Sequence, residues 1–546
     1  MKHFLLLMCL VFWASIHCSA QQNTAYKSLD TKNPIVFGGD YIIYQDDTFT
    51  LGPKAFFIDG QLTDAEVAAY PYVYNSVRKA AEKLTDGAEE SPMVLYLAPY
   101  VYWIDDPDDP ALRVSTDKGP PYGLVIKCEW LRFYGLTDKP ENVVLASNRG
   151  QTIGAEGNFT MFKFIGQGTS AENVTFGNYC NVDLVYPLKP QLNRKKRATA
   201  IVQAQLIHCN GDKIVARNTH FISRLNLNPF VGGKRVLFDR CHFESTDDAL
   251  CGTAVYLNCT LDFYSSKPFY HTTGTGAVFL NSDIRLFTRG EQYFTKVEGQ
   301  LAVVDTRFTA ETSLDIGWMD IPPKEMRNYQ HNVSLNGKDV VISKNSPAST
   351  VQMAGKEVLD AYRFVHRDNV VYNTYNLLSG NDGWDPMGIR EIVLAAEKER
   401  EKNYSMLPVQ LLVSPTRLSV ETGKNRAGLS AKVLRFGNFE LEAETVSWHV
   451  APEDSALVKL EVSKTGSNCQ VIPTNTGDRS RQVIITAATP SGLEAASVIE
   501  VVPPVLDAPQ FSSLPEIKLQ KNGKLQLEYK LATAYADQSL VRFSCS

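Results

Sequence analysis

One short pattern of apolar and polar positions recurs through the middle of the chain. Each copy starts with apolar residues, passes through a polar residue and a small Thr, Cys or Ser, and ends on a large apolar residue. The copies occupy residues 215–221, 237–243, 255–261, 278–284 and 303–308, and the small residue recurs at intervals of 18 to 24 positions. A period of this length in strand-type residues predicts a solenoid, in which each coil buries its inward side chains against the next. A leucine-rich repeat is disfavoured because its Leu and Asn framework and its helical halves are missing.

Other patterns flank these repeats. Residues 72–84 have helical spacing and predict an amphipathic helix that caps the first coil. Residues 93–97 predict a strand. The repeats stop around residues 377–386, and a charged helix is expected over 389–401, at the end of the solenoid.

From about residue 407 the pattern changes to short strands separated by Gly, Pro and Asn turns. The strand-like segments are 410–413, 418–421, 446–450, 482–486 and 497–501. Such spacing over roughly 100 residues predicts an immunoglobulin-like β-sandwich. We therefore expect an all-β chain in four parts: a signal peptide at 1–20, a right-handed, single-stranded parallel β-helix at 21–402, the sandwich at 403–505, and a partial or truncated β domain at 506–546.

The first residues combine a positive start with a short apolar run. Residues 4–13 are nearly all apolar, and small residues end at Ala20. This arrangement predicts a signal peptide cleaved after Ala20, and hence a secreted or periplasmic protein. Lipid attachment at Cys18 is the alternative, but the bulky His17 before it disfavours that modification. No later stretch reaches the roughly 18 apolar residues that a transmembrane helix needs.

Composition narrows the function classes. The chain has 546 residues and a net charge of −5, which does not suggest nucleic-acid binding. Its ten cysteines contain no Cys-x-x-Cys pair, so a zinc site is not expected. Several of them recur within the repeats, where we expect small buried thiols stacked in the core rather than disulfides. No cofactor or metal is implied, and a monomer is expected.

Two neighbouring repeats carry the most specific motifs. Gln203-Ala204 stands eight residues before Gly211-Asp212, and an Asp-Ala-Leu-Cys-Gly stretch begins at Asp248, seven residues after a repeat cysteine. Over roughly residues 60–320 the chain resembles the pectin methylesterase family of carbohydrate esterases, which carry comparable motifs on successive coils. The resemblance implies a pectin lyase-like fold. It also implies hydrolysis of methyl, or acetyl, esters on a galacturonate-containing pectic polysaccharide.

The family's catalytic residues carry over only in part. The resemblance makes Asp248 the nucleophile, Gln203 a support for the oxyanion, and Lys296 the cation beside the nucleophile, where the family has an arginine. The family's second aspartate, its general acid/base, falls on Asn226, which forms hydrogen bonds but does not shuttle a proton near neutral pH. Asp247 is a candidate replacement. Successive side chains of a regular strand face opposite sides, so this role requires a bend in the backbone.

Three functions stay open at this point. The first is an esterase with rearranged acid/base groups, and the second is a groove that binds pectin without cleaving it. The third is another pectin-active enzyme, of the polygalacturonase or lyase type. Residues 245–249 resemble the Gly-Asp-Asp-Ala stretch of polygalacturonases, although the Gly-His-Gly and Arg-Ile-Lys motifs of those enzymes are missing. Candidate substrate contacts are Asp247, Arg224, and the outward-facing pair His220 and His242.

Two charged segments each have a functional and an ordinary interpretation. Residues 103–110 include four aspartates, which are either calcium ligands or, as we expect, a flexible acidic loop. Residues 194–197 are four consecutive cations, which either attract a polyanionic galacturonan or, as we expect, form a solvated loop.

Overall fold

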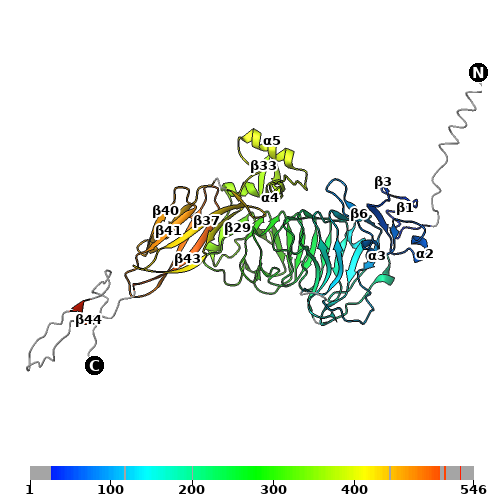
Figure 1. Cartoon of the computed structure of the whole chain (residues 1–546), viewed down its shortest axis with the longest axis horizontal. Coiled ribbons are helices and arrows are strands. Elements are labelled where there is room, and N and C mark those ends of the chain that lie inside the picture. Colours follow the sequence, from blue (N-terminus) through cyan, green and yellow to red (C-terminus); the bar gives the residue numbers. More distant parts are fainter. Residues whose placement is uncertain are drawn as a thin grey trace, which may run out of the picture. The chain divides into compact units, whose positions relative to one another are not determined.

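The structure is a computed structural model, and it describes residues 26–115, 119–199, 201–441, 444–504, 510–511 and 529–530. The predicted signal peptide at 1–20, with Cys18, and almost all of the predicted domain at 506–546 lie outside the described residues. The chain is mostly β-structure and divides into two compact units (Figure 1). The first unit consists of residues 1–321, 329–345 and 377–390, and the second of 322–328, 346–376 and 391–546.

Two long sheets of mainly parallel strands run through the first unit. In spatial order, the larger sheet contains within this unit β29 (Asn328–His331), β26 (Leu301–Val304), β23 (Ala277–Leu280), β21 (Ala254–Leu257), β19 (Val236–Asp239), β17 (Ile214–Arg217), β14 (Ser170–Glu172), β9 (Leu131–Gly135), β6 (Met93–Leu97), β4 (Ala55–Ile58) and β5 (Val73–Tyr74). The second contains β31 (Lys338–Asp339), β30 (Ser334–Leu335), β27 (Arg307–Ala310), β24 (Asp283–Leu286), β22 (Thr260–Phe263), β20 (His242–Ser245), β18 (His220–Ile222), β15 (Thr175–Asn178), β10 (Val143–Ser147) and β7 (Tyr100–Trp103). Through the repeat region, consecutive strands alternate between the two sheets, so each sequence repeat contributes one strand to each.

A third face is built partly from strands and partly from extended segments. Its strands are β8 (Tyr122–Lys127), β13 (Phe159–Ile165) and β16 (Ala204–Cys209), which pair in parallel. Backbone hydrogen bonds continue the face beyond β16: the amide of Ala204 donates to Leu225 at 3.2 Å, and that of Asn226 to Asp247 at 3.1 Å. Coils that stack on three faces in this way are compatible with a parallel β-helix.

The polar residue of each repeat turns the chain from one long sheet to the other. Each repeat forms two short strands with a left-handed residue between them. The φ angles at these corners lie between 41° and 53°, at Asn218, Arg240, Asn258, Asn281 and Asp305. Asn and Asp adopt this conformation more readily than most residues, which explains why they recur there. Their side chains also join neighbouring coils, because Asn281 Nδ2 donates to Asn258 Oδ1 at 2.7 Å.

The small residue after each corner lies in the core. Cys241 Sγ donates to the carbonyl of Ala216 at 3.4 Å, and Cys259 bonds the backbone in the same way. Every cysteine in the described part of the chain is free and buried. This finding confirms the prediction of core thiols. Phenylalanine rings stack beside them from coil to coil, with the centroids of Phe221 and Phe243 5.0 Å apart.

The N-terminal cap differs from the helix predicted over 72–84. Two of those residues form β5, which pairs with β4, and the helix α3 covers only Val77–Ala81. Strand pairing at the first coil overrides the helical spacing, because it satisfies backbone groups on an otherwise open sheet edge. The cap also includes β1 (Ile35–Phe37), β2 (Tyr41–Tyr44), β3 (Asp47–Thr50) and the short helix α2 (Asp64–Val67).

The second unit contains two sheets of mostly antiparallel strands. One consists of β35 (Gln410–Ser414), β37 (Ala427–Arg435), β38 (Phe439–Leu441), β40 (Val458–Val462) and β41 (Asn468–Pro473). The other consists of β36 (Arg417–Glu421), β39 (Ser447–Val450), β42 (Arg481–Ala488) and β43 (Glu494–Val502). The predicted segments at 410–413, 418–421, 446–450, 482–486 and 497–501 correspond to β35, β36, β39, β42 and β43. The helix expected over 389–401 forms as α5 (Arg390–Arg400).

The remaining elements include helix α4 (Thr374–Leu378) and the hairpin of β33 (Arg363–His366) and β34 (Asn369–Tyr372). Within the described ranges, no helix has the length and apolar character needed to cross a membrane.

Candidate functional site

Asp247 and Asp248 lie directly after β20, where the chain turns from the second long sheet onto the third face. Asp248 has a φ of 52°, so the backbone bends in the left-handed region instead of continuing as a strand. This bend is the one that the sequence argument required. Both carboxylates reach one ammonium group: Lys296 Nζ lies 2.6 Å from Asp247 Oδ2 and 3.0 Å from Asp248 Oδ2. The side chain of Asp248 is 24% exposed, so it faces the surface and not the solenoid core.

Lys296 comes from the third face two coils further on. It follows β25 (Gln292–Tyr293), and its amide donates to the carbonyl of Phe269 at 3.1 Å. Burial lowers the pKa of Lys296, but the hydrogen bonds and charges of Asp247 and Asp248 outweigh burial and raise its pKa overall. Lys296 is therefore a fixed cation between two carboxylates.

The two aspartates differ in how many of their oxygens have partners. Ser265 Oγ donates to Asp247 Oδ1 at 3.0 Å, so both oxygens of Asp247 are engaged. Asp248 Oδ1 is buried and accepts no hydrogen bond from the residues that the structure describes. A buried oxygen without a partner costs roughly 1–3 kcal/mol. Such a cost in a native protein calls for an explanation, and a catalytic role is one.

Asn226 lies on the preceding coil, beside this pair. It is 9% exposed and left-handed, with a φ of 53°, and its amide donates to the Asp247 carbonyl. Its Oδ1 is also buried and accepts no hydrogen bond within the described residues. The structure thus places orphaned oxygens of Asn226 and Asp248 on adjacent coils, as the sequence motifs predicted for these two positions.

Gln203 lies one coil before Asn226. Its carbonyl accepts the amide of Gln151 at 2.8 Å, and its half-buried side chain makes no hydrogen bond with Asp248 within the described residues. The neighbouring Gln205 is the more deeply buried amide, with its Oε1 accepting from Thr160 Oγ1 at 2.7 Å. Gln203 therefore shares the face of the candidate site without contacting the carboxylate pair.

His220 and His242 form an edge-to-face pair on β18 and β20, with ring centroids 5.2 Å apart. They alternate with inward phenylalanines and so face outward, as predicted, but both are largely covered. Burial, followed by the charge of a neighbouring cation or imidazole, lowers the pKa of each ring to about 4. His242 Nδ1 lies 2.8 Å from Thr260 Oγ1. The two rings contact each other and Thr260, and the role of this pair as a substrate contact stays a prediction.

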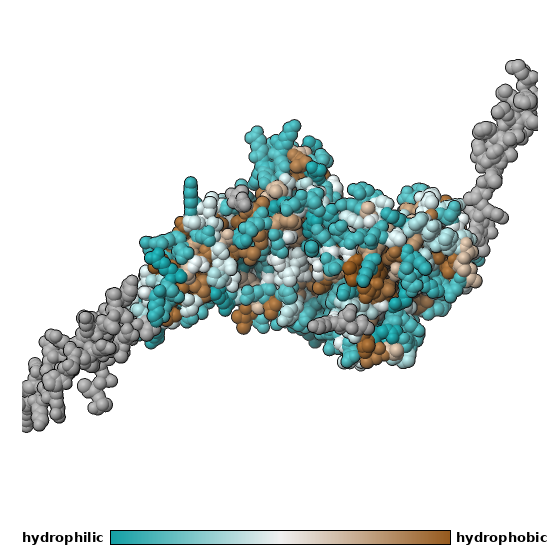
Figure 2. Space-filling view, in the orientation of Figure 1, coloured by the Kyte–Doolittle hydropathy of each residue, from teal (hydrophilic) through white to brown (hydrophobic). Residues whose placement is uncertain are grey.

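Arg224 belongs to a strip of side chains next to the carboxylate pair. It pairs with Glu244 at 2.9 Å, and its guanidinium lies 4.0 Å from the centroid of the Tyr264 ring. Tyr264 in turn stacks on Phe287 of the next coil at 4.7 Å. These two rings are 37% and 47% exposed. Figure 2 shows that the surface in view carries hydrophobic areas among hydrophilic ones. Because Tyr264 directly precedes Ser265, the strip borders the candidate site.

Sequence reasoning missed the acidic members of this strip. Burial raises the pKa of Glu244, although the charge of Arg224 opposes that shift. Burial likewise raises the pKa of Asp262, against two hydrogen bonds of 2.6 Å from Arg285. The period-2 alternation of β20 and β22 would have placed both carboxyl groups on the outer face, two residues after His242 and Thr260.

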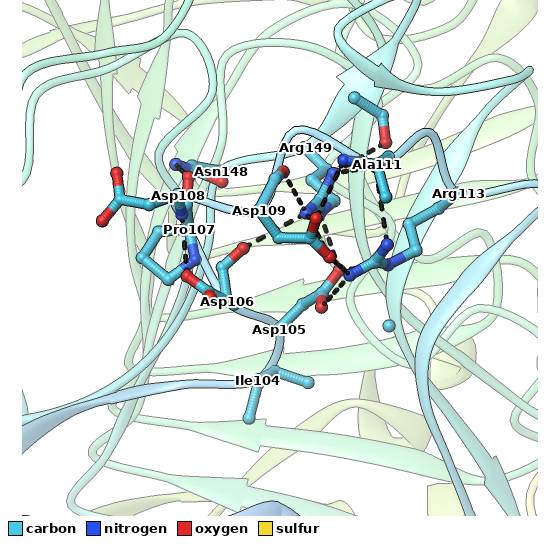
Figure 3. Close-up of polar contacts among 12 residues, drawn as sticks. Ile104, Asp105, Asp106, Pro107, Asp108, Asp109, Ala111, Arg113, Asn148 and Arg149 are labelled. Carbon is cyan, nitrogen blue, oxygen red and sulfur yellow. Dashed lines mark hydrogen bonds and ion pairs between the residues drawn. The ribbon is translucent and has the colours of Figure 1, made fainter.

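The acidic loop at 103–110 is ordered by arginines, which corrects the expectation of a flexible loop and leaves little for calcium (Figure 3). Arg149 is fully buried, and its Nε lies 2.6 Å from Asp105 Oδ2. Arg113 contacts both Asp105 and Asp109, at 2.7 and 2.6 Å. The other nitrogens of Arg149 donate to the backbone carbonyls of Asp106, Asp109, Ala111 and Gly154. The sequence separation of Arg149 from the loop hid this pairing.

The basic loop at 194–197 is partly neutralised. Arg194 pairs with Asp108 and lies 5.4 Å from the Trp103 ring, and Lys195 pairs with Asp183 at 2.8 Å.

The side chains of Asp247, Lys296 and Asp248 are 37%, 30% and 24% exposed, so the carboxylate pair and its ammonium are accessible from solvent. Cavities of about 440 Å³ are also lined by residues between 313 and 344 in the first unit, and between 422 and 476 in the second, and neither of these two includes Asp248.

A scan against protein-family models finds no match for this chain. A search of curated proteins finds no match either.

Proposed function

We propose that this chain is an exported, pectinesterase-like protein that hydrolyses methyl or acetyl esters on a galacturonate-containing pectic polysaccharide. In this proposal the first unit is a right-handed parallel β-helix of the pectin lyase-like type, and the second an immunoglobulin-like module. The observation that carries the proposal is the bend at Asp248, which brings two adjacent carboxylates to one ammonium on the outer surface.

The proposed reaction assigns a separate role to each group. Asp248 attacks the ester carbonyl through Oδ1, which has no hydrogen bond to give up, and Lys296 holds the carboxylate in place through Oδ2. Asp247, in its protonated form, supplies a proton to the departing alcohol and takes one back from the water that hydrolyses the resulting anhydride. Gln203, to which the resemblance gives this role, supports the oxyanion together with the side-chain amide of Asn226.

The test is methanol and acetate release from methylated, acetylated pectin by the full chain. Asp248→Asn should reduce release by about three orders of magnitude, because it removes the nucleophile while keeping the shape of the side chain. Asp283→Asn is a matched control, since Asp283 is an exposed aspartate paired with Arg307 elsewhere on the solenoid. Equal release by wild type and Asp248→Asn would refute the mechanism.

A second candidate function is binding of pectin without hydrolysis. The amide at position 226 favours it, since the family's acid/base is replaced there by a group that does not carry a proton. Calorimetric binding of a pectin oligosaccharide without any release of methanol or acetate would support this second function over the first.

A further inference from the structure

The second unit contains an open cavity of about 440 Å³ at one end of its sheets. The turn between β36 and β37 forms one wall, and the residues at the end of β41 form the other. Sites for small ligands usually have volumes of roughly 300–1,000 Å³. The cavity is therefore large enough for one or two sugar residues, and it lies wholly within the second unit.

The hydroxyl group of Thr422, which lines this cavity, has no evident role in stabilising the fold. The residue is 7% exposed, and its Oγ1 makes no hydrogen bond within the described part of the chain. A buried hydroxyl without a partner destabilises a fold, and a valine of the same shape would avoid that cost. Because Oγ1 is buried, its contact with a ligand in the cavity requires rotation about the Cα–Cβ bond of Thr422.

The rim of the cavity supplies positive charge. The side chains of Lys424 and Arg426 both line it and are 64% and 63% exposed. Lys424 pairs with Glu421 at 2.9 Å, and Arg426 pairs loosely with Glu461 at 3.4 Å. Exposed ion pairs of this kind contribute little to stability, so a ligand carboxylate can replace the protein carboxylate at low cost. The planar guanidinium of Arg426 also matches a carboxylate with two parallel hydrogen bonds.

The remaining lining suits a sugar ring. Asn425 Oδ1 accepts the amide of Glu421 at 2.8 Å, which leaves its Nδ2 as a donor toward hydroxyl groups. Pro473 and Ile472 add an apolar surface opposite the turn. A ligand with one carboxylate, several hydroxyl groups and a compact apolar face satisfies all of these groups together.

We propose that this cavity binds a uronate residue of an acidic polysaccharide, with the carboxylate on Arg426 and Lys424 and a hydroxyl on Thr422. The second unit then holds the polymer while the first unit acts on it. The choice of a uronate as ligand rests on the proposed function, whereas the existence of the site rests on the cavity and the orphaned hydroxyl.

Calorimetry of the full chain with trigalacturonic acid tests the proposal. Arg426→Gln should weaken binding at one site at least tenfold, because it removes a charge-assisted pair. Thr422→Val should weaken the same site and also raise the melting temperature, a combination that a purely structural threonine would not give. Lys432→Gln is the control, since Lys432 is an exposed cation on the same unit that pairs with Glu440 outside the cavity.

Two results would overturn the proposal. If Arg426→Gln and Thr422→Val both bind trigalacturonic acid as wild type does, the cavity is not a binding site for it. Equal affinity for a neutral galactose trisaccharide removes the uronate as its ligand. Methanol release, measured on the same samples, fails or succeeds independently, so a Thr422-dependent site without ester hydrolysis would sink the proposed function and leave the cavity proposal standing.

Discussion

The pair of His220 and His242 should make the free energy of unfolding of the first unit fall as the pH is lowered. Burial holds the pKa of both rings at about 4, compared with an ordinary value of about 6.5 in an unfolded chain. The unfolded chain therefore binds more protons than the folded one between these two pH values. Stability is fully present above pH 6.5 and is lost as the pH falls toward 4.

The size of the effect follows from the two pKa values. Consider one histidine with a pKa of about 4 in the folded chain and about 6.5 in the unfolded chain. Between pH 7 and pH 5 it lowers the free energy of unfolding by about 2 kcal/mol. The two rings together withdraw about 4 kcal/mol, which is a large part of the roughly 5–15 kcal/mol that stabilises a typical domain. Replacing His220 by glutamine should roughly halve this contribution.

The measurement is urea unfolding, followed by tryptophan fluorescence, at a series of pH values between 7.5 and 5. The quantity compared is the difference in unfolding free energy between each variant and wild type at each pH, which cancels the contribution of the carboxyl groups. His449→Gln serves as the control that removes an exposed histidine from the second unit. The reasoning is refuted if the double variant His220→Gln/His242→Gln loses as much stability between pH 7 and pH 5 as wild type does.

Three further predictions concern other parts of the structure. Arg149→Met should destabilise the first unit by about 3–5 kcal/mol in urea unfolding, since it leaves four backbone carbonyls without their donor and Asp105 with Arg113 as its remaining cation; a change below 1 kcal/mol would contradict this role. Phe221→Ala should cost about 3–5 kcal/mol in the same assay, because it opens the stack of rings between coils; an unchanged midpoint would mean that the stack contributes little. Lys296→Met should lower methanol release by about 100-fold or more, because Asp248 loses its positioning cation; unchanged kinetics would exclude Lys296 from the reaction.

Much of the solenoid could be predicted from the sequence because its repeat is local. The period of the small core residue predicted the coils, whereas the left-handed corners at the recurring Asn and Asp were found only in the structure. The cap was harder to predict. Residues 72–84 have helical spacing, yet pairing with β4 draws two of them into a strand, and no local pattern reveals that partner.

The candidate site could be predicted only where neighbouring coils carry its residues in register. Asp248, Asn226 and Lys296 were proposed from the resemblance to family motifs on successive coils, and their catalytic roles stay predictions. The partners of the acidic loop, in contrast, come from Arg149, about 40 residues away, and alternation alone does not reveal such a pairing. Asp247 and Asp248 can face the same cation only because the φ angle of Asp248 is positive. An aspartate adopts such an angle more readily than most residues, but its presence in a sequence does not predict the angle.

The buried thiols have a consequence for how this protein can be made and followed. Because the described cysteines are free, the core that holds them needs no oxidant to fold, and production in a reducing cytosol should give the same core. Each thiol also reports on the coil that holds it, since an alkylating reagent reacts only when that coil opens. Reaction rates at Cys128, Cys209 and Cys259, read peptide by peptide in a mass spectrometer, would therefore show whether the stack unravels from its ends or opens all at once.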